Sequence, residues 1–198
     1  METPSITTHW HTIETALQEI APAIYSSLNT GATETEVARL EALIGARLPL
    51  AFVESCKVHD GQNADAGGLI ETEELLSLER ITAEWGIWKG LLEDGTFEED
   101  GKPFASEPDA GVKADWWNAL WIPITYDGSG NHYCLDLDPA PGGTTGQIIR
   151  MWHDDGERSL VAASFEEWMG DFAGKLVAGT MVYSEDYGGI MDKDEAKE

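Results

Sequence analysis

Ser129 is the side chain whose neighbours best suit a nucleophile, because it stands between two glycines in Asp127-Gly128-Ser129-Gly130-Asn131. A serine nucleophile of the G-x-S-x-G kind needs a sharp strand-to-helix turn and a neighbouring base. This run lacks that spacing, and strand-like sequence follows it rather than a helix. The sequence therefore predicts a structural hairpin turn here and no nucleophile.

Two acidic sets could bind a hard cation or transfer protons. His153-Asp154-Asp155 offers nitrogen and oxygen ligands. Asp136 and Asp138 stand two residues apart in strand-like sequence, where their side chains would share one face. Gly156 follows the first set, which favours a polar turn, and Pro139 follows the second, which favours the end of a strand. We interpret both sets as structural, and a metal-dependent enzyme acting through the first set stays open as a third class of function.

The cysteines and the glycine-rich loop match no cofactor motif. Cys56 and Cys134 stand in separate apolar segments without a C-x-x-C spacing, which favours buried thiols over a redox or zinc site. Residues 142–146 join two predicted strands, whereas a phosphate-binding loop leads into a helix and carries a Lys-Ser/Thr pair. The sequence therefore predicts no catalytic residue, no metal ligand and no cofactor.

The elements that must position these residues form a β-meander. Residues 120–125 are nearly all apolar, as in a strand buried on both faces. Residues 132–137 alternate, with Tyr133 and Leu135 on one side of the predicted strand. Residues 146–152 and 160–163 complete an antiparallel sheet, and turn residues stand between the strands.

Helices precede and follow this sheet. Residues 10–24 carry an apolar stripe at three- and four-residue steps. Thr33 with Glu36 forms a capping box for a second helix, and Pro49 suits the first turn of a third. Ser164 with Glu167 predicts a capped closing helix. The predicted fold class is α+β, with an antiparallel sheet of about five strands covered on one face by N-terminal and C-terminal helices.

The predicted organisation is one domain over residues 1–188 and a disordered acidic tail over residues 189–198. Ser77 begins a further helix, and after it residues 92–113 are charged, glycine-bearing and aperiodic, which predicts a solvated loop or flexible insertion. No apolar run approaches the roughly 20 residues of a membrane span. Because the start of the sequence also lacks the pattern of a secretory signal, we expect a cytoplasmic protein.

Charge is the other informative bulk property. The chain carries 37 acidic and 12 basic side chains, a formal net charge of −25. A field of this size disfavours nucleic acid and anionic membranes as partners and favours fast association with basic proteins. An acidic halophilic proteome is an alternative explanation of the same charge. Between residues 60 and 112 stand 14 acids and 3 bases, so the central part of the chain carries much of the excess.

Several short motifs occur in a characteristic order along the chain. They are Trp10 with Ile13-Glu14, Gly31-Ala32-Thr33-Glu34-Thr35-Glu36, Leu48-Pro49, His59-Asp60-Gly61, the meander of residues 116–147, and Ser164-Phe165 with Trp168. In this order they resemble the SUKH superfamily, which contains many bacterial toxin-immunity proteins and the fungal regulators of cell-wall synthesis. The resemblance extends over roughly residues 10–178 and implies a SUKH-like domain.

The resemblance implies two functions. The first is an immunity protein that binds and neutralises a cognate polymorphic toxin without catalysis, the toxin being delivered by a contact-dependent or type VI secretion route. Such toxins are often nucleases, and a basic nuclease would be attracted by this acidic chain. The alternative is an intracellular regulatory or scaffold module, as the fungal members suggest. The oligomeric state stays open.

Acidic side chains of the central segment and two tryptophans are the predicted partner-binding residues. Since Trp116 and Trp117 are adjacent, they cannot both face inward in a regular element, so one of them is expected to be an exposed anchor. The predicted set is Glu73, Glu74, Asp94, Glu98, Glu99, Asp100, Asp109, Asp115, Trp116 and Trp117.

Overall fold

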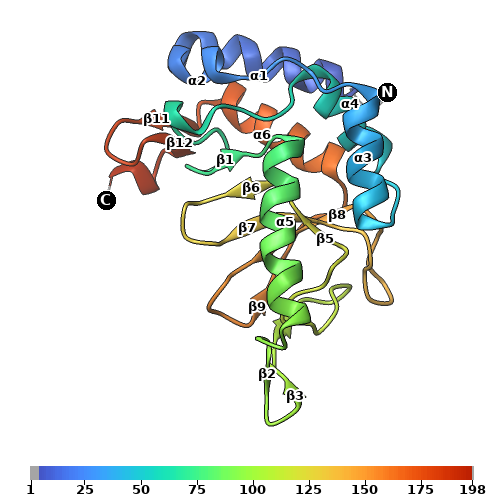
Figure 1. Cartoon of the computed structure of the whole chain (residues 1–198). Coiled ribbons are helices and arrows are strands. Elements are labelled where there is room, and N and C mark those ends of the chain that lie inside the picture. Colours follow the sequence, from blue (N-terminus) through green and yellow to red (C-terminus); the bar gives the residue numbers. More distant parts are fainter. Residues whose placement is uncertain (1–4, 198) are drawn as a thin grey trace.

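The computed structural model describes residues 5–197 and has an antiparallel sheet of four strands at its centre (Figure 1). The strands follow the order β10 (Leu160–Ala162), β8 (Gln147–Met151), β7 (His132–Asp136) and β5 (Trp121–Pro123). Every residue of β7 and β8 is buried. The α+β fold class is thus confirmed, and the predicted meander supplies the sheet.

The hairpin between β5 and β7 carries a short additional pairing. Beside β7, β6 (Thr125–Tyr126) pairs with β1 (Glu74–Leu75) in an antiparallel arrangement. The turn that follows β6 is closed by Asp127, whose carboxylate accepts hydrogen bonds from the backbone amides of Ser129, Gly130 and Asn131. This turn chemistry explains why the predicted hairpin forms at this point of the sequence.

Six α-helices surround the sheet, and their ends follow the capping signals of the sequence. They are α1 (Ile6–Ile20), α2 (Pro22–Ser27), α3 (Glu34–Ile44), α4 (Leu50–Val58), α5 (Leu78–Glu93) and α6 (Phe165–Ala178) in residues 5–197. Thr33 and Glu36 form the predicted capping box at the start of α3, and Gly45 ends that helix in the left-handed conformation. Ser164 caps α6 by accepting a hydrogen bond from the amide of Glu167.

Helices cover both faces of the sheet, whereas the sequence suggests cover on one face. On one face Tyr133 of β7 contacts Trp168 of α6, with ring centroids 5.6 Å apart. On the opposite face the neighbouring His132 contacts Trp88 of α5 at 6.2 Å. Figure 1 shows α5 crossing the strands and α1 lying over α6 on the side away from the sheet. The apolar stripe of α5 is visible in the sequence, but nothing local specifies which surface it packs on.

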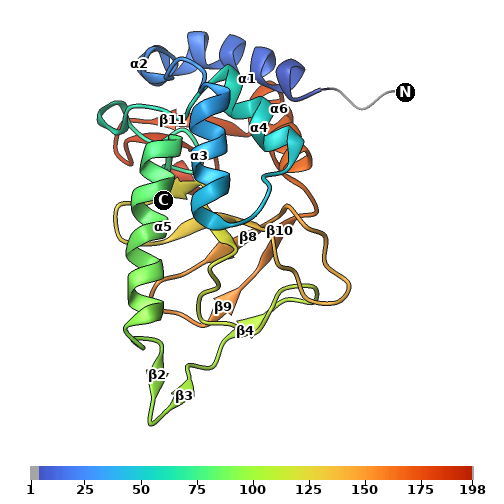
Figure 2. The same cartoon turned by 45° about the vertical axis from the view of Figure 1, so that its right-hand side comes forward.

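The segment after α5 contains short pairings instead of an unstructured loop. It forms β2 (Glu98–Glu99) and β3 (Lys102–Pro103), an antiparallel hairpin, and β4 (Glu107–Pro108), which pairs in parallel with β9 (Glu157–Arg158). Both views show the hairpin projecting from the end of the molecule opposite α1 (Figures 1 and 2). Phe97 anchors its base, buried and stacked on Trp88 at 5.6 Å.

The C-terminal segment is structured over most of the range assigned to a disordered tail. β11 (Met181–Ser184) and β12 (Gly189–Asp192) form a hairpin, and a 3₁₀ turn follows at Glu195–Lys197. Ile190 of β12 is fully buried, and its amide donates to the carbonyl of Gly68. Together with η1 (Ala64–Ala66), these elements complete the described chain. Within residues 5–197, no helix combines the length and apolar character needed to cross a bilayer.

Candidate functional site

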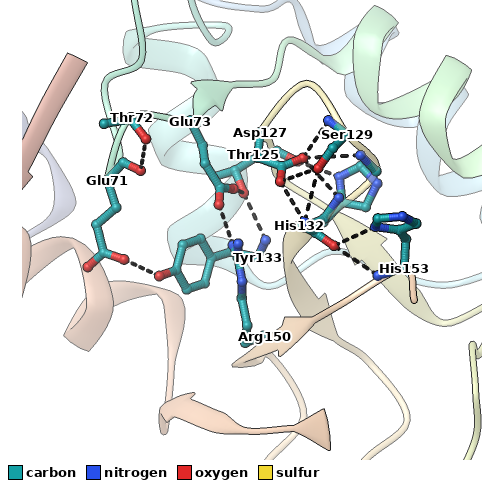
Figure 3. A network of polar contacts seen from close by, with 12 residues as sticks. Glu71, Thr72, Glu73, Thr125, Asp127, Ser129, His132, Tyr133, Arg150 and His153 are labelled. Atoms are coloured by element: carbon teal, nitrogen blue, oxygen red, sulfur yellow. Dashed lines mark hydrogen bonds and ion pairs between the residues drawn. The ribbon is translucent and has the colours of Figure 1, made fainter. Parts of the chain in front are cut away.

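A buried ion pair lies where the turn of residues 70–73 meets the sheet (Figure 3). The side chain of Glu73 is only 4% exposed and pairs with the guanidinium of Arg150 in β8. Its second oxygen accepts a hydrogen bond of 2.6 Å from the hydroxyl of Thr125. Burial raises the pKa of Glu73, against the opposing effects of Arg150 and Thr125. Glu73 therefore faces the interior and is not available to a partner.

Aromatic rings enclose the cationic side of this pair. The guanidinium carbon of Arg150 lies 4.6 Å from the ring centre of Tyr133 and 4.1 Å from that of Trp152. The Tyr133 hydroxyl donates to the carboxylate of Glu71, which extends the network to the protein surface. The Nε atom of Arg150 is one of four buried side-chain nitrogen or oxygen atoms that have no hydrogen-bond partner in the described part of the chain. The arrangement matches an ion pair held by packing, in which each charge is compensated.

Thr125 joins the ion pair to a buried histidine. Its hydroxyl accepts from the Tyr133 amide at 2.8 Å, and its carbonyl accepts from Nδ1 of His132 at 2.6 Å. Nε2 of His132 accepts from the indole nitrogen of Trp88 at 3.0 Å, so the proton of the neutral ring is on Nδ1. Burial lowers the pKa of His132 to about 4. Both nitrogens have structural partners, and neither can accept a proton from a substrate.

The polar side chains of the turn beside His132 also form hydrogen bonds within the protein. The Ser129 hydroxyl donates to Asp127 at 2.6 Å, and the Asn131 side chain bridges Asp127 and His153. Burial opposes ionisation of Asp127, but hydrogen bonds from Ser129 and Asn131 lower its pKa to about 2. Ser129 thus contacts a carboxylate without an adjacent histidine to activate it. Across residues 5–197, no cluster of three or more His, Cys, Asp or Glu side chains could hold a metal ion.

The predicted partner-binding carboxylates separate into buried and exposed groups. Glu74 is buried and forms an ion pair with Arg80. The carboxylate of Asp109 accepts from the Leu160 amide at 2.8 Å, and that of Asp115 accepts from Asn118 at 2.8 Å. Asp115 is half-buried and Asp109 is exposed, and the other exposed members, Asp94, Glu98, Glu99 and Asp100, lie on the projecting hairpin and the helix end before it. The structure therefore does not bring the predicted set together in one place.

The two adjacent tryptophans also differ. Trp117 is 3% exposed and stacks on Trp88 at 6.1 Å. Trp116 is half-buried: Phe104 packs edge-on against its ring at 5.4 Å, and the guanidinium of Arg158 lies 5.1 Å from the ring centre. Arg158 also donates to the Trp116 carbonyl at 2.6 Å, so both the ring and the carbonyl of Trp116 form contacts within the protein.

The sequence interpretation missed the residues that organise the interior. Arg150 and Arg158 are buried bases in a chain that has 12 basic side chains in total. The available signal is Arg150 within the run Gln147-Ile148-Ile149-Arg150-Met151, where a charge interrupts an apolar strand. A charge in such a position implies a buried partner. The partner, Glu73, is 77 residues away in the sequence and cannot be identified from spacing.

Comparison with known proteins relates this fold to a group of regulators. The sequence model of the SMI1 / KNR4 family (SUKH-1) matches residues 31–171. A Glucan synthesis regulatory protein of Neurospora crassa is 26% identical over 91% of this chain and 40% of its own length. The Cell wall biosynthesis/cell cycle regulator smi1 of Schizosaccharomyces pombe is 28% identical over 92% of this chain and 38% of its own. The Cell wall assembly regulator SMI1 of Saccharomyces cerevisiae is 24% identical over 89% and 41%.

These relatives overturn one of the two functions that the superfamily resemblance implies. All three are named for cell-wall or glucan regulation, and the prediction of a toxin-immunity protein with a nuclease toxin as its partner is therefore wrong. The chain spans about two fifths of the length of these relatives. The predicted superfamily is confirmed, and since the family model matches most of the sequence, the chain belongs to the SMI1 / KNR4 family (SUKH-1).

Proposed function

We propose that this chain is a regulatory or scaffold module related to the regulators of cell-wall synthesis, and that it acts by binding other proteins. The observation that supports the proposal most strongly is its similarity to three cell-wall or glucan regulators along about nine tenths of its length. Each relative is much longer than this chain. The module would therefore supply one part of such a regulator's activity.

The interior of the protein supports binding rather than catalysis. His132, Ser129 and Glu73 have the side-chain types of catalytic groups, yet each is engaged by structural partners. The surface carries the remaining chemistry, with a formal net charge of −25 over the whole chain. A field of this sign attracts basic segments of partner proteins and speeds their encounter. Partners with exposed Lys or Arg clusters fit this surface best.

A chimera tests the proposal. In a Saccharomyces cerevisiae strain lacking its Cell wall assembly regulator SMI1, the segment of that regulator matched by this chain is replaced by the chain itself. We expect the chimera to restore growth under inhibition of glucan synthesis, because the module supplies the same partner contacts. The control is the same chimera with Trp121→Ala, which removes a fully buried ring and costs about 3–5 kcal/mol of stability. Equal growth with both chimeras, or with neither, contradicts the proposal.

A further inference from the structure

A cavity of about 530 Å³ lies between α6, β10 and the turn of residues 70–73. Two buried aromatic side chains of α6, Trp168 and Phe172, line it together with Val161 of β10. None of these three side chains belongs to the ion-pair network of Glu73 and Arg150. The cavity thus has an apolar wall and lies beside β10, the last strand in the order of the sheet.

Carboxylates dominate the charged groups that line this cavity. Glu71, Glu167 and Asp171 contribute negative charge, and Lys175 contributes one positive charge. Lys175 is already paired with Asp171 at 2.8 Å, and Glu71 accepts from the Tyr133 hydroxyl. Glu167 is exposed and forms no ion pair with any described residue. The local excess of negative charge is complementary to a Lys or Arg side chain, whose stem would lie on the aromatic wall.

The strand beside the cavity is a three-residue edge strand, and its pairing with β8 has a register shift between Leu160 and Ala162. Leu160 and Val161 are 39% and 41% exposed, and β10 contains neither a charged residue nor a proline. Its shortness and its register shift are two of the devices that limit the pairing of edge strands with other chains, whereas charged residues and proline are two that it lacks. The edge is covered as far as Leu160, whose amide donates to Asp109 next to the β4–β9 pairing. From Val161 onward, β10 has β8 on one side and no strand of the described chain on the other.

We propose that an extended, basic segment of a partner protein pairs with the free edge of β10 and places one Lys or Arg side chain in the cavity. The inference rests on the proposed function and names the class of partner. Backbone pairing with the edge would supply the affinity, and alternate side chains would supply the selectivity. Because successive side chains of a strand point to opposite sides, a segment that alternates basic and apolar residues fits best. The free edge is short, so the complex should be weak and sensitive to salt.

A peptide of defined sequence tests this surface on the full chain. The probe is fluorescein-labelled Val-Lys-Val-Arg-Val-Lys-Val with a C-terminal amide, and its acidic counterpart carries Glu at each basic position. We expect the basic peptide to bind by fluorescence anisotropy, and the acidic peptide to show no binding. The variant Glu167→Lys with Asp171→Lys should weaken binding about tenfold or more, since it reverses charge at the cavity. Absence of binding by the basic peptide to the unmodified protein overturns the inference.

A matched control separates local contact from the overall field. Glu98→Lys with Glu99→Lys makes the same change in net charge on the projecting hairpin, far from α6 in both views (Figures 1 and 2). At about 0.15 M salt, where the screening length is about 8 Å, this control should change the affinity by no more than about twofold. Equal weakening by both double variants contradicts a specific cavity. Thermal melting of both proteins verifies that they fold.

Two further readouts test strand pairing and the link to function. Methylation of alternate backbone nitrogens in the probe removes donors without changing the protein, and it should abolish binding if the peptide adds to β10. Undiminished binding of the methylated probe contradicts strand addition.

In the chimera, Glu167→Lys with Asp171→Lys should abolish restored growth. If the unmodified chimera works and this variant works equally well, the inference fails and the proposed function stands. If no chimera works but the peptide binds at the cavity, the function fails and the surface stands.

Discussion

At the scale of single residues, Thr125 is the junction of the buried network (Figure 3). Its hydroxyl donates to Glu73 and accepts from the amide of Tyr133, while its carbonyl fixes the ring of His132. One short side chain thus links the ion pair on one face of the sheet to the histidine on the other. Polar groups that are fully satisfied in this way specify a unique interior, and they leave little capacity for chemistry.

The ion pair of Glu73 and Arg150 leads to a prediction about coupling. Arg150→Met leaves a buried carboxylate without its partner and should lower the free energy of unfolding by about 3–5 kcal/mol. Arg150→Met combined with Glu73→Gln should cost clearly less than the sum of the two single changes, because no unpaired charge remains. Urea denaturation of the four proteins in a double-mutant cycle measures this difference. Strictly additive values contradict the compensated pair.

His132 leads to a prediction about pH. Its pKa falls from 6.5 to about 4 on folding, so the unfolded chain takes up a proton below about pH 6.5 while the folded chain resists it. The contribution of His132 to stability is therefore complete above pH 6.5 and is lost as the pH falls toward 4. NMR titration of the ring should show a neutral Nδ1–H tautomer at pH 5. Protonation of the ring near pH 6.5 contradicts the buried hydrogen bonds.

At the scale of elements, the sequence predicted those helix ends and turns that depend on contacts between residues close together in the chain. The capping box of Thr33 and Glu36 and the turn at Asp127 satisfy backbone groups within a few residues, and both occur as predicted. The position of α5 over the second face of the sheet was not predictable, because its apolar stripe is equally compatible with several surfaces. The site was harder still. The sequence shows that Glu73 is acidic, but only the fold shows that Glu73 is buried and paired with Arg150, which is far away in the sequence.

The turn of residues 70–73 and the C-terminal hairpin are joined by backbone hydrogen bonds, an interlock that leads to a prediction at this scale. The amide of Thr72 donates to the carbonyl of Ile190, and the amide of Ile190 donates to the carbonyl of Gly68. A Cβ atom on Gly68 would lie 2.0 Å from backbone atoms of Thr72, so Gly68→Ala must displace Gly68 from the turn and disturb the β-bridge that Gly68 forms with Gly189 of the hairpin. We expect a loss of more than about 2 kcal/mol and faster hydrogen exchange at the amide of Ile190, which donates to Gly68. Gly174→Ala is the control. Its Cβ meets no neighbour within 4 Å on α6, and it should stabilise by about 0.5–1 kcal/mol. Similar effects of the two substitutions contradict the interlock.

At the scale of the whole molecule, the fold and the charge are separate sources of information. The superfamily fold accommodates both toxin inhibition and cell-wall regulation, so the fold alone does not choose between them. The acidic surface is likewise compatible with any basic partner. The choice came from the names of relatives matched along most of the chain, and that information is not present in periodicity or composition. The proposed surface at the edge of β10 assigns partner binding to a specific part of the molecule.

The central proposal is that this chain is a protein-binding module related to the regulators of cell-wall synthesis, and cell-wall glucan content tests it most directly. The measurement compares a Saccharomyces cerevisiae strain lacking its Cell wall assembly regulator SMI1 with the same strain carrying the unmodified chimera or the Trp121→Ala chimera. The account predicts that glucan returns toward the normal level only with the unmodified chimera. Glucan that stays at the level of the deletion strain, although the chimera is folded and expressed, contradicts the account.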